Sequence, residues 1–379
     1  MTKVKTGIIG VGFIGEEHLK ALRAHESVEV IGIADQSTDL AAARSRQYGV
    51  PFYTDPIALM EEARPDYVTI CTPHFSHTSF AIEAMRRGIH VLVEKPLTVS
   101  ASAADECLRV MRETGMKLGV GYLQRLRTAH RKVYDLVQSG FVGRIQRVTM
   151  VRTAWFRSMA YYRSNPWRGT WKGEGGGILV NQAPHDLDLL VWTAGLPSEV
   201  LVEMGTLGHD IEVEDDVCAV LKWANGATGT LHVSTNEAPG RSFYEIAGTK
   251  GTLRLEDGCV TATALAVDSH EFSETTQERM VPPPTGGEML FRQPPEPVEF
   301  STLPGMHANF AAALREGAPL VCSAEEALQE VELANAMLLS GVTRQWVQVP
   351  VDRAEYDRVL EELMATRSLE AYKAKRAGR

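Results

Sequence analysis

The sequence predicts an α/β protein in which an N-terminal, doubly wound parallel sheet precedes an α+β domain with a mainly antiparallel sheet. Three features predict this arrangement. Short apolar strands alternate with helices in the first third of the chain, a glycine-rich turn follows the first strand, and later strands follow one another without intervening helices. Because 379 residues are too many for one ordinary core, we expect two domains, residues 1–123 and 124–379.

The first domain is expected to contain buried strands that are separated by helices. Strands are predicted over residues 4–9, 28–34, 67–71, 90–93 and 117–121, and helices over 12–25, 40–48, 78–87 and 103–113. Apolar strands joined by helices of this length form parallel sheets that are covered on both faces.

The pattern changes after about residue 123. A helix over 129–139 and a half-exposed strand over 144–153 precede a loop rich in aromatic residues, and a helix follows over 182–193. Strands are then predicted over 199–205, 216–223, 227–234, 242–247 and 252–255, with turn signals at 224–227 and 248–251 that indicate hairpins. Residues 281–297 hold six prolines and are predicted to be an irregular surface excursion, and helical patterns end the chain over 307–315, 324–340 and from 355 onward.

The composition argues against several classes of protein. A net charge of −9 disfavours general nucleic-acid binding, which requires a basic surface. Five scattered cysteines without a C-x-x-C pair disfavour a disulfide framework or a zinc site and favour a reducing compartment. The N-terminus lacks the features of a secretory signal, and no apolar run is long enough to span a membrane, so we expect a cytoplasmic protein.

The glycine-rich turn predicts a dinucleotide site. Gly10, Gly12 and Gly15 fit the pattern G-x-G-x-x-G between a predicted strand and a predicted helix, which is the context that a Rossmann fold requires. Gly10 would permit the tight turn, Gly12 the approach of the pyrophosphate, and Gly15 the close packing of helix on strand. Phe13 and Ile14 open the helix, whose free N–H groups would face the phosphates.

An acidic residue at the end of the second strand favours NAD as the cofactor. Asp35 lies 20 residues after Gly15, where a carboxylate should accept hydrogen bonds from the adenosine ribose. The same carboxylate would repel a 2′-phosphate, and the following Gln36 and Ser37 provide no arginine to bind one, so NADP is the less favoured cofactor. The alternative is that Asp35 caps the next helix.

A lysine follows the strand predicted over 90–93. Glu94, Lys95 and Pro96 come directly after this strand, and ligands of open parallel sheets lie beyond the carboxyl ends of the strands. Lys95 is therefore predicted to enter the crevice of the glycine turn, although a solvated loop lysine is the alternative.

The segment after the preceding strand should reach the same edge of the sheet. We expect Thr72 and Pro73 to contact the cofactor. His77 is expected either to lie beneath the nicotinamide or to cap the next helix.

A second polar cluster is predicted around the helix that begins near residue 182. A glycine run over 175–177 precedes Asn181 and His185, which are four residues apart and would share one helix face, and Asp188 lies near that face. Such a face suits proton handling. The alternatives are a buried histidine that is satisfied by Asp188 and a metal site, which the lack of a second nearby histidine disfavours, so we expect no metal.

These motifs together resemble the Gfo/Idh/MocA oxidoreductase family over nearly the whole chain. The resemblance is carried by the glycine motif 10–15, by the triplet 94–96, by the G-G-G-x-L-x-N-Q-x-x-H-x-x-D run over 175–188 and by the stretch 246–252. It implies a Rossmann domain joined to a domain with a large open sheet, through which family members associate as homodimers or homotetramers.

The resemblance also implies roles for particular residues. Lys95 matches the family's active-site lysine and His185 its active-site histidine, while Asn181 stands where inositol dehydrogenases carry aspartate. These three residues are therefore expected to contact the substrate. Glu94 belongs to the triplet that is expected to contact the cofactor.

Two further segments match family segments near the cofactor. Trp167 and Arg168 resemble a pair found beside it, and Gln124 and Arg125 resemble a segment that lines the nicotinamide side. We expect Gln124 to contact the cofactor and Arg125 the substrate. In the aromatic loop, Tyr161 is expected to pack against a sugar, although ordinary packing between domains is an equal alternative.

These expectations define a hydride-transfer mechanism. His185 is predicted to accept the hydroxyl proton while Lys95 positions and polarises the oxygen, and the swapped assignment stays open. The expected function is an NAD-dependent oxidoreductase acting on a secondary alcohol of a sugar, glycoside or cyclitol, for example a glycoside 3-dehydrogenase or an inositol dehydrogenase. The alternatives are an NAD-dependent glycosidase that uses transient oxidation and elimination, and a non-catalytic NAD-binding sensor. We expect neither nucleic acid nor membrane as a partner.

Overall fold

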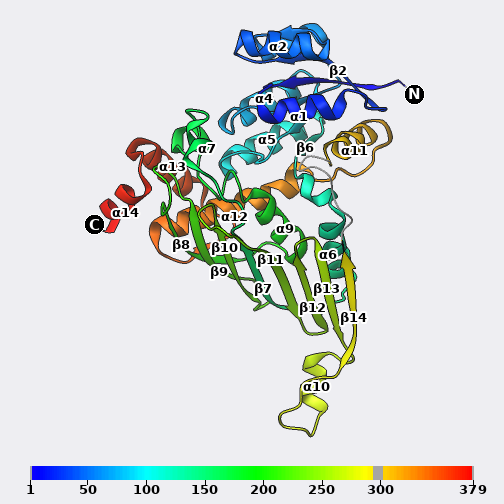
Figure 1. Cartoon of the computed structure of the whole chain (residues 1–379), viewed down its shortest axis with the longest axis vertical. Helices are drawn as coiled ribbons and strands as arrows, with labels where there is room; N and C mark the ends of the chain where they lie inside the picture. Colours follow the sequence, from blue (N-terminus) through cyan, green and yellow to red (C-terminus); the bar gives the residue numbers. More distant parts are fainter. Residues whose placement is uncertain (1, 293–301, 378–379) are drawn as a thin grey trace. The chain divides into compact units, whose positions relative to one another are not determined.

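The computed structural model describes residues 2–292 and 302–377, which form two compact units (Figure 1). The described part of the first unit comprises residues 2–126, 173–175 and 302–331, and that of the second comprises 127–172, 176–292 and 332–377. A late segment thus joins the first unit, whereas the sequence-based division used a single boundary at 123. The division into domains at residue 123 stays a prediction.

The first unit contains the predicted doubly wound sheet. Its order is β3-β2-β1-β4-β5-β6 and every pair of neighbours is parallel. The order reverses between β1 and β4, which is where a ligand crevice opens in such sheets. The strands are β1 (Val4–Ile9), β2 (Val28–Ala34), β3 (Phe52–Tyr53), β4 (Tyr67–Ile70), β5 (His90–Val93) and β6 (Leu118–Val120).

Helices and capping residues complete the first unit. Ser37 and Ser100 cap helices through their side chains, and Gly49 and Gly115 end the same helices in the left-handed conformation. The helical segments are α1 (Phe13–Leu22), α2 (Thr38–Tyr48), α3 (Pro56–Ala58), η1 (Leu59–Ala63), α4 (Phe75–Arg86), α5 (Ala101–Thr114), η2 (Leu123–Leu126) and α11 (Leu303–Glu316).

Helix α11 contributes to the core of the first unit although it lies late in the chain. Leu303, Met306 and Phe310 belong to the same buried apolar cluster as Ile8 on β1. The ring of Phe310 packs against that of Tyr67, with 4.8 Å between centroids. The predicted helix over 307–315 therefore begins earlier than expected, at Leu303.

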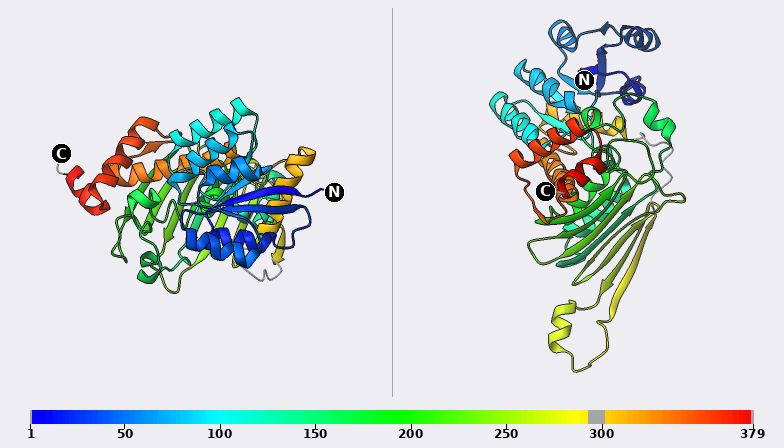
Figure 2. Two further views of the ribbon diagram at one scale, coloured as in Figure 1. Left: turned by 90° about the horizontal axis from the view of Figure 1, so that it is seen from above. Right: turned by 90° about the vertical axis from the view of Figure 1, so that its left-hand side faces the viewer.

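The second unit contains the predicted open sheet. Its order is β14-β13-β12-β11-β7-β10-β9-β8-β15, and among these described strands only the β7–β10 pair is parallel. Figure 2 shows the ribbon from two further directions. The strands are β7 (Ile145–Arg152), β8 (Glu199–Gly205), β9 (Asp216–Lys222), β10 (Thr228–Ser234), β11 (Ser242–Gly248), β12 (Gly251–Glu256), β13 (Cys259–Leu265), β14 (Thr285–Arg292) and β15 (Val347–Gln348).

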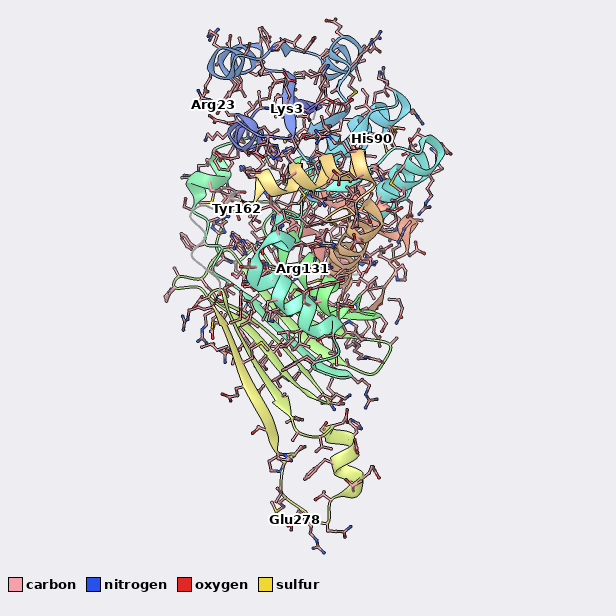
Figure 3. The ribbon with its side chains drawn as sticks, turned by 90° about the vertical axis from the view of Figure 1, so that its right-hand side faces the viewer. Lys3, Arg23, His90, Arg131, Tyr162 and Glu278 are labelled. Carbon is pink, nitrogen blue, oxygen red and sulfur yellow. The ribbon has the colours of Figure 1, made fainter. Side chains whose placement is uncertain are left out.

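Helices pack against this sheet, and buried and exposed residues alternate along most of its strands. On α6, Arg131 (Figure 3) lies near the Tyr134 ring, which stacks on Trp192 of α9 with 4.1 Å between centroids. The helices are α6 (Thr128–Gln138), α7 (Met159–Arg163), α9 (Pro184–Ala194), α10 (Ser269–Thr275), α13 (Arg353–Thr366) and α14 (Leu369–Ala377). The remaining helices are α8 (Trp171–Glu174) and α12 (Ala324–Thr343), whose residues are divided between the two units.

The expectation of an irregular excursion over 281–297 is wrong for most of its described residues. Residues 285–292 form the edge strand β14, which pairs with β13 from Cys259 to Leu265. The three prolines at 282–284 lie before the strand and leave its backbone N–H groups free to pair. Residues 293–297 lie outside the described residues.

Within residues 2–292 and 302–377, no helix combines the length and the apolar character needed to cross a bilayer.

Candidate active site

The glycine turn has the geometry of a dinucleotide cradle. Gly10 has φ +85°, and a Cβ there would lie 2.8 Å from the carbonyl oxygen of Cys71. A Cβ on Gly15 would lie 2.0 Å from the carbonyl oxygen of Gly10, so both positions require glycine. Gly12, at the N-cap of α1, is different, because a Cβ there would meet nothing within 4 Å. This open space at a helix N-terminus fits a phosphate group.

The residues that open α1 flank this cradle. Phe13 is 67% exposed, which is unusual for an aromatic side chain in a folded unit, and Ile14 is half-buried against the core. An apolar side chain beside the turn could cover a bound cofactor. The predicted contacts of both residues with the cofactor stay predictions.

Asp35 holds the glycine turn and does not cap a helix. One carboxylate oxygen accepts the backbone N–H of Val11 at 2.9 Å and the other accepts that of Ser37 at 2.9 Å. Helix α2 is instead capped by Ser37, whose hydroxyl accepts the N–H of Leu40, so the alternative role of Asp35 as a cap is wrong. Its half-exposed carboxylate ends β2 beside the turn, as recognition of a ribose requires.

His77 joins the two loops that follow β4 and β5. Its Nε2 lies 2.9 Å from the carbonyl oxygen of Thr72, and its Nδ1 lies 2.8 Å from that of Pro96. Burial lowers the pKa of this imidazole, which favours its neutral form. His77 lies within α4 and not at its N-cap, which is His74, so the predicted capping role is wrong. Its predicted contact with the cofactor, like those of Thr72 and Pro73, stays a prediction.

Glu94 is buried directly before the half-buried Lys95. Its carboxylate lies 2.9 Å from Nε2 of His18, and its other oxygen accepts the backbone N–H of Lys95 at 3.3 Å. A Cβ on Gly121 would lie 3.0 Å from the carboxylate, so this glycine leaves room for it. The charge directly before Lys95 is thus held inside the first unit.

Gln124 and Arg125 are both buried in η2. The Arg125 guanidinium donates to Glu326 at 2.9 Å and to the carbonyl oxygen of Val321 at 3.2 Å. Arg125 therefore anchors η2 to the start of α12 within the first unit. Its predicted contact with the substrate and that of Gln124 with the cofactor stay predictions.

In the second unit, several predicted site residues converge on the hydroxyl of Tyr161. Asn181 donates to it at 3.3 Å, Gln182 donates at 3.2 Å, and Arg168 donates through its guanidinium. The guanidiniums of Arg168 and Arg157 lie 4.3 and 5.1 Å from the centroid of the Tyr161 ring. The sequence did not predict the contribution of Gln182.

Trp167 belongs to the same cluster. The Arg168 guanidinium lies 4.6 Å from the centroid of its ring, so Arg168 is held between two aromatic side chains. The predicted contacts of Trp167 and Arg168 with the cofactor stay predictions.

His185 lies half-buried in the first turn of α9, which begins at Pro184. Asn181 precedes the helix, so the expectation that both residues share a face of one helix is wrong. A turn in which the Asn181 N–H donates to the carbonyl oxygen of Gly177 at 2.9 Å positions Asn181 instead. Beside His185, the buried Asp186 pairs with Arg152 at 2.8 Å and accepts the indole N–H of Trp155 at 3.1 Å.

The glycine run before α9 packs against a buried carboxylate that the sequence did not predict. A Cβ on Gly177 would lie 1.9 Å from the carbonyl oxygen of Glu214. The Glu214 carboxylate accepts the N–H groups of Gly177 at 2.8 Å and Leu179 at 3.1 Å. The glycine therefore allows a close approach of two backbones, and Glu214 fixes the segment that leads to His185. The acidic triplet at 214–216 was the one feature of the sequence that could have pointed to this buried carboxylate.

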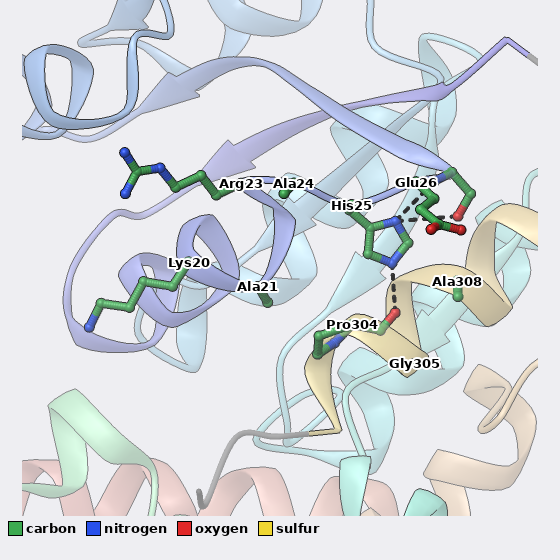
Figure 4. Close-up of a pocket in the computed structure, with 10 residues that line it drawn as sticks. Lys20, Ala21, Arg23, Ala24, His25, Glu26, Pro304, Gly305 and Ala308 are labelled. Carbon is green, nitrogen blue, oxygen red and sulfur yellow. Dashed lines mark hydrogen bonds between the residues drawn. The ribbon is translucent and has the colours of Figure 1, made fainter.

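Neither a metal cluster nor the hollow at the end of α1 marks the site. Across the described ranges, no three His, Cys, Asp or Glu side chains are grouped as a metal centre would require. A hollow lined by Lys20, Arg23, His25, Pro304 and Gly305 lies at the C-terminal end of α1 (Figure 4), whereas the glycine turn lies at its N-terminal end. This hollow is therefore not the dinucleotide cradle.

Comparison with protein families agrees with this geometry. Residues 4–122 match the oxidoreductase family with an NAD-binding Rossmann fold, GFO_IDH_MocA, and residues 130–254 match the GFO/IDH/MocA C-terminal domain. The chain therefore belongs to the GFO/IDH/MocA oxidoreductases. The predictions of the family, the fold class, NAD as cofactor and an oxidoreductase activity are confirmed.

Individual relatives cover most of the chain. Inositol 2-dehydrogenase of Rhizobium meliloti (strain 1021) is 24% identical over 91% of this chain and 99% of its own. Levoglucosan dehydrogenase of Pseudarthrobacter phenanthrenivorans (strain DSM 18606 / JCM 16027 / LMG 23796 / Sphe3) is 25% identical over 92% of this chain and 99% of its own. The WlbA dehydrogenase from Bordetella pertussis, solved in complex with NADH and UDP-GlcNAcA, has a TM-score of 0.78 and 26% identity and covers 93% of this chain and 100% of its own.

Replacing Asp35 by Ser tests its role in choosing the cofactor. The variant loses the carboxylate that would bind the ribose hydroxyls and repel a 2′-phosphate, so we expect NAD to bind roughly tenfold more weakly and the preference for NAD over NADP to shrink. Titration of both reduced cofactors by protein fluorescence measures the two affinities. Asp39→Ser, on the exposed start of α2, is the matched control. An unchanged ratio of the two affinities in Asp35→Ser would contradict the assignment.

Proposed function

We propose that this protein is an NAD-dependent dehydrogenase that oxidises a secondary alcohol of a sugar, glycoside or cyclitol. The observation that carries the proposal is the arrangement at the carboxyl edge of the parallel sheet. The glycine turn follows β1, and Lys95 comes two residues after Val93, where β5 ends. Strand β4 pairs with both strands, so the turn and the lysine follow strands at the same edge.

The chemistry follows from what these residues can hold. NAD, when bound in the cradle, supplies the acceptor for the hydride that leaves the carbinol carbon. Lys95 positions and polarises the alcohol oxygen, and His185 accepts the hydroxyl proton as the C=O bond forms. The C–H bond thus loses a hydride, the O–H bond loses a proton, and the imidazole later releases that proton to water.

The Tyr161 cluster supports a hydroxyl-rich substrate. The hydroxyl of Tyr161 and the amides of Asn181 and Gln182 offer donors and acceptors in one place, and aromatic rings pack against the C–H faces of sugars. Relatives named for inositol and levoglucosan agree with this class of substrate.

The oligomeric state and the location belong to the same proposal. We propose a homodimer or homotetramer that associates through the open sheet of the second unit, where Val220 on β9 is 41% exposed and Leu290 on β14 is 64% exposed. Five free cysteines agree with the reducing, cytoplasmic location that the sequence predicts.

Sedimentation velocity tests the oligomeric proposal. We expect a species of two or four chains because the exposed apolar residues of the sheet would be covered by a second copy. Val220→Glu places a charge on that face and should shift the distribution toward the 41.7 kDa monomer. Leu207→Glu, at a 72% exposed position outside the sheet, is the control. A wild-type protein that sediments only as a monomer would contradict the proposal.

A panel of sugars, glycosides and cyclitols with NAD tests the proposed reaction. We expect at least one compound to produce NADH, measured by its absorbance, together with a ketone product detected by mass spectrometry. Release of a free sugar from a glycoside without net NADH would indicate oxidation and elimination instead. Binding of NAD without turnover of any compound would favour a sensor and contradict the proposal.

Variants of the two proposed catalytic residues test the mechanism. We expect Lys95→Ala and His185→Ala each to lower kcat by roughly 10²–10⁴-fold, the usual size of acid–base contributions. The affinity for NADH should change only a few-fold, because the glycine turn and Asp35 remain. Lys20→Ala, an exposed lysine on α1 that pairs with Glu17, is the control. Wild-type kcat in His185→Ala at every pH would reject the assignment of His185 as base.

A further inference from the structure

The first unit contains a chain of four buried polar side chains that the mechanism above does not use. The hydroxyl of Tyr67 lies 2.7 Å from Nδ1 of His307. Nε2 of His307 lies 2.8 Å from Nδ1 of His18, and Nε2 of His18 lies 2.9 Å from the carboxylate of Glu94. Glu94 is 7% exposed and the other three side chains 1% or less. The chain joins β4, α11 and α1 to the residue before Lys95.

When Glu94 is ionised and each imidazole carries a single proton, the hydrogen bonds can run in only one direction. A carboxylate only accepts, so His18 must carry its proton on Nε2 and leave Nδ1 as an acceptor. His307 must then donate from Nε2, which leaves its Nδ1 to accept the hydroxyl proton of Tyr67. Both imidazoles are neutral in this arrangement, and each of the three hydrogen bonds has one donor and one acceptor.

The surroundings of these four side chains favour donation in the direction from Tyr67 to Glu94. Burial lowers the pKa of His307 well below its usual value, so this imidazole stays neutral. Burial raises the pKa of the Tyr67 hydroxyl, which therefore keeps its proton. The opposite direction needs one more proton, on Glu94, and reverses the tautomer of both histidines.

We propose that Tyr67, His307 and His18 are positioning residues that fix one tautomer of each histidine and thereby hold Glu94 as an oriented carboxylate directly before Lys95. The proposal deepens the proposed dehydrogenase function and rests on it for its effect on catalysis. Because His18 lies on the helix that the glycine turn begins, the same chain links the cradle to the lysine loop.

Other titratable groups lie near these four hydrogen-bonded side chains and could also contribute to a pH profile. The charge of Glu94 acts on Cys71 and His77, and Lys95 follows it. Asp66 acts on Tyr67, and His25 acts on His307. The experiments must therefore separate Glu94 from these neighbours.

Nitrogen-15 NMR of the imidazole rings tests the tautomers without any substrate. In the wild-type protein labelled at histidine, we expect both His18 and His307 to be protonated at Nε2 and bare at Nδ1, which have distinct shifts. Loss of a signal in His18→Gln or in His307→Gln assigns each ring. Tyr67→Phe removes the terminal donor and should populate the Nδ1–H form of His307. A wild-type spectrum with either ring protonated at Nδ1 would overturn the proposal, whatever reaction the enzyme catalyses.

The pH dependence of kcat/KM with NAD and a substrate from the panel tests the role of the chain in catalysis. His18→Leu removes a donor to the buried carboxylate, so Glu94 should take up a proton at higher pH, and the acid limb of the profile should move up by about one pH unit. His18→Gln, whose amide can donate, should restore most of the shift, and Tyr67→Phe should give a smaller shift in the same direction.

Tyr244→Phe is the matched control. It removes a buried hydroxyl in the second unit whose partner Thr193 keeps another hydrogen bond, to the carbonyl oxygen of Leu189. Its acid limb should stay at the wild-type position. The proposal would be overturned if the acid limb of the kcat/KM profile lay at the wild-type pH in both His18→Leu and Tyr67→Phe. If His18→Leu fails to fold, Tyr67→Phe together with the wild-type spectrum decides the question.

Discussion

The backbone of α1 lies so close to the turn before it that only a hydrogen atom fits between them at Gly15. A Cβ there would lie 2.0 Å from the carbonyl oxygen of Gly10, well inside any allowed contact. This approach aims the start of α1 at the open space above Gly12, and it sets the position of every later residue on the helix. His18, one turn further on, thereby reaches Glu94. The cradle and the lysine loop thus depend on the same close contact.

The sequence predicted the parts of the molecule that local patterns encode. The glycine spacing with its flanking strand and helix, Asp35 at the end of β2, and Lys95 after β5 all lie where short-range rules place them. The mainly antiparallel sheet was also recognisable, because its strands follow one another without intervening helices and turn signals separate three of them. The family then connected these parts to NAD and to oxidoreductase chemistry.

Contacts between residues far apart in sequence could not be predicted in this way. His18 and His307 are separated by 289 positions, and no local pattern marks either as the partner of the other. The close approach of Gly177 to Glu214 is also invisible without the fold, since the glycine alone indicates only that something comes near. The strand β14 was not predicted, because the prolines around it indicated an irregular loop, whereas the eight residues 285–292 pair with β13. Asp35 does follow the end of β2 as predicted. Its hydrogen bond to the backbone N–H of Val11 could not be predicted from the sequence.

The inclusion of α11 in the first unit has a consequence for how the protein is made. Leu303, Met306 and Phe310 complete an apolar cluster whose other members include Ile8 and Tyr67, near the beginning of the chain. A nascent chain that has left the ribosome only as far as residue 126 therefore exposes an unfinished apolar surface. The nucleotide-binding half closes only after the whole intervening sheet has been synthesised, so biosynthesis order and structural order differ in this protein. Residues near the N-terminus, such as Ile8, complete their packing only after residues 303–310 have been synthesised.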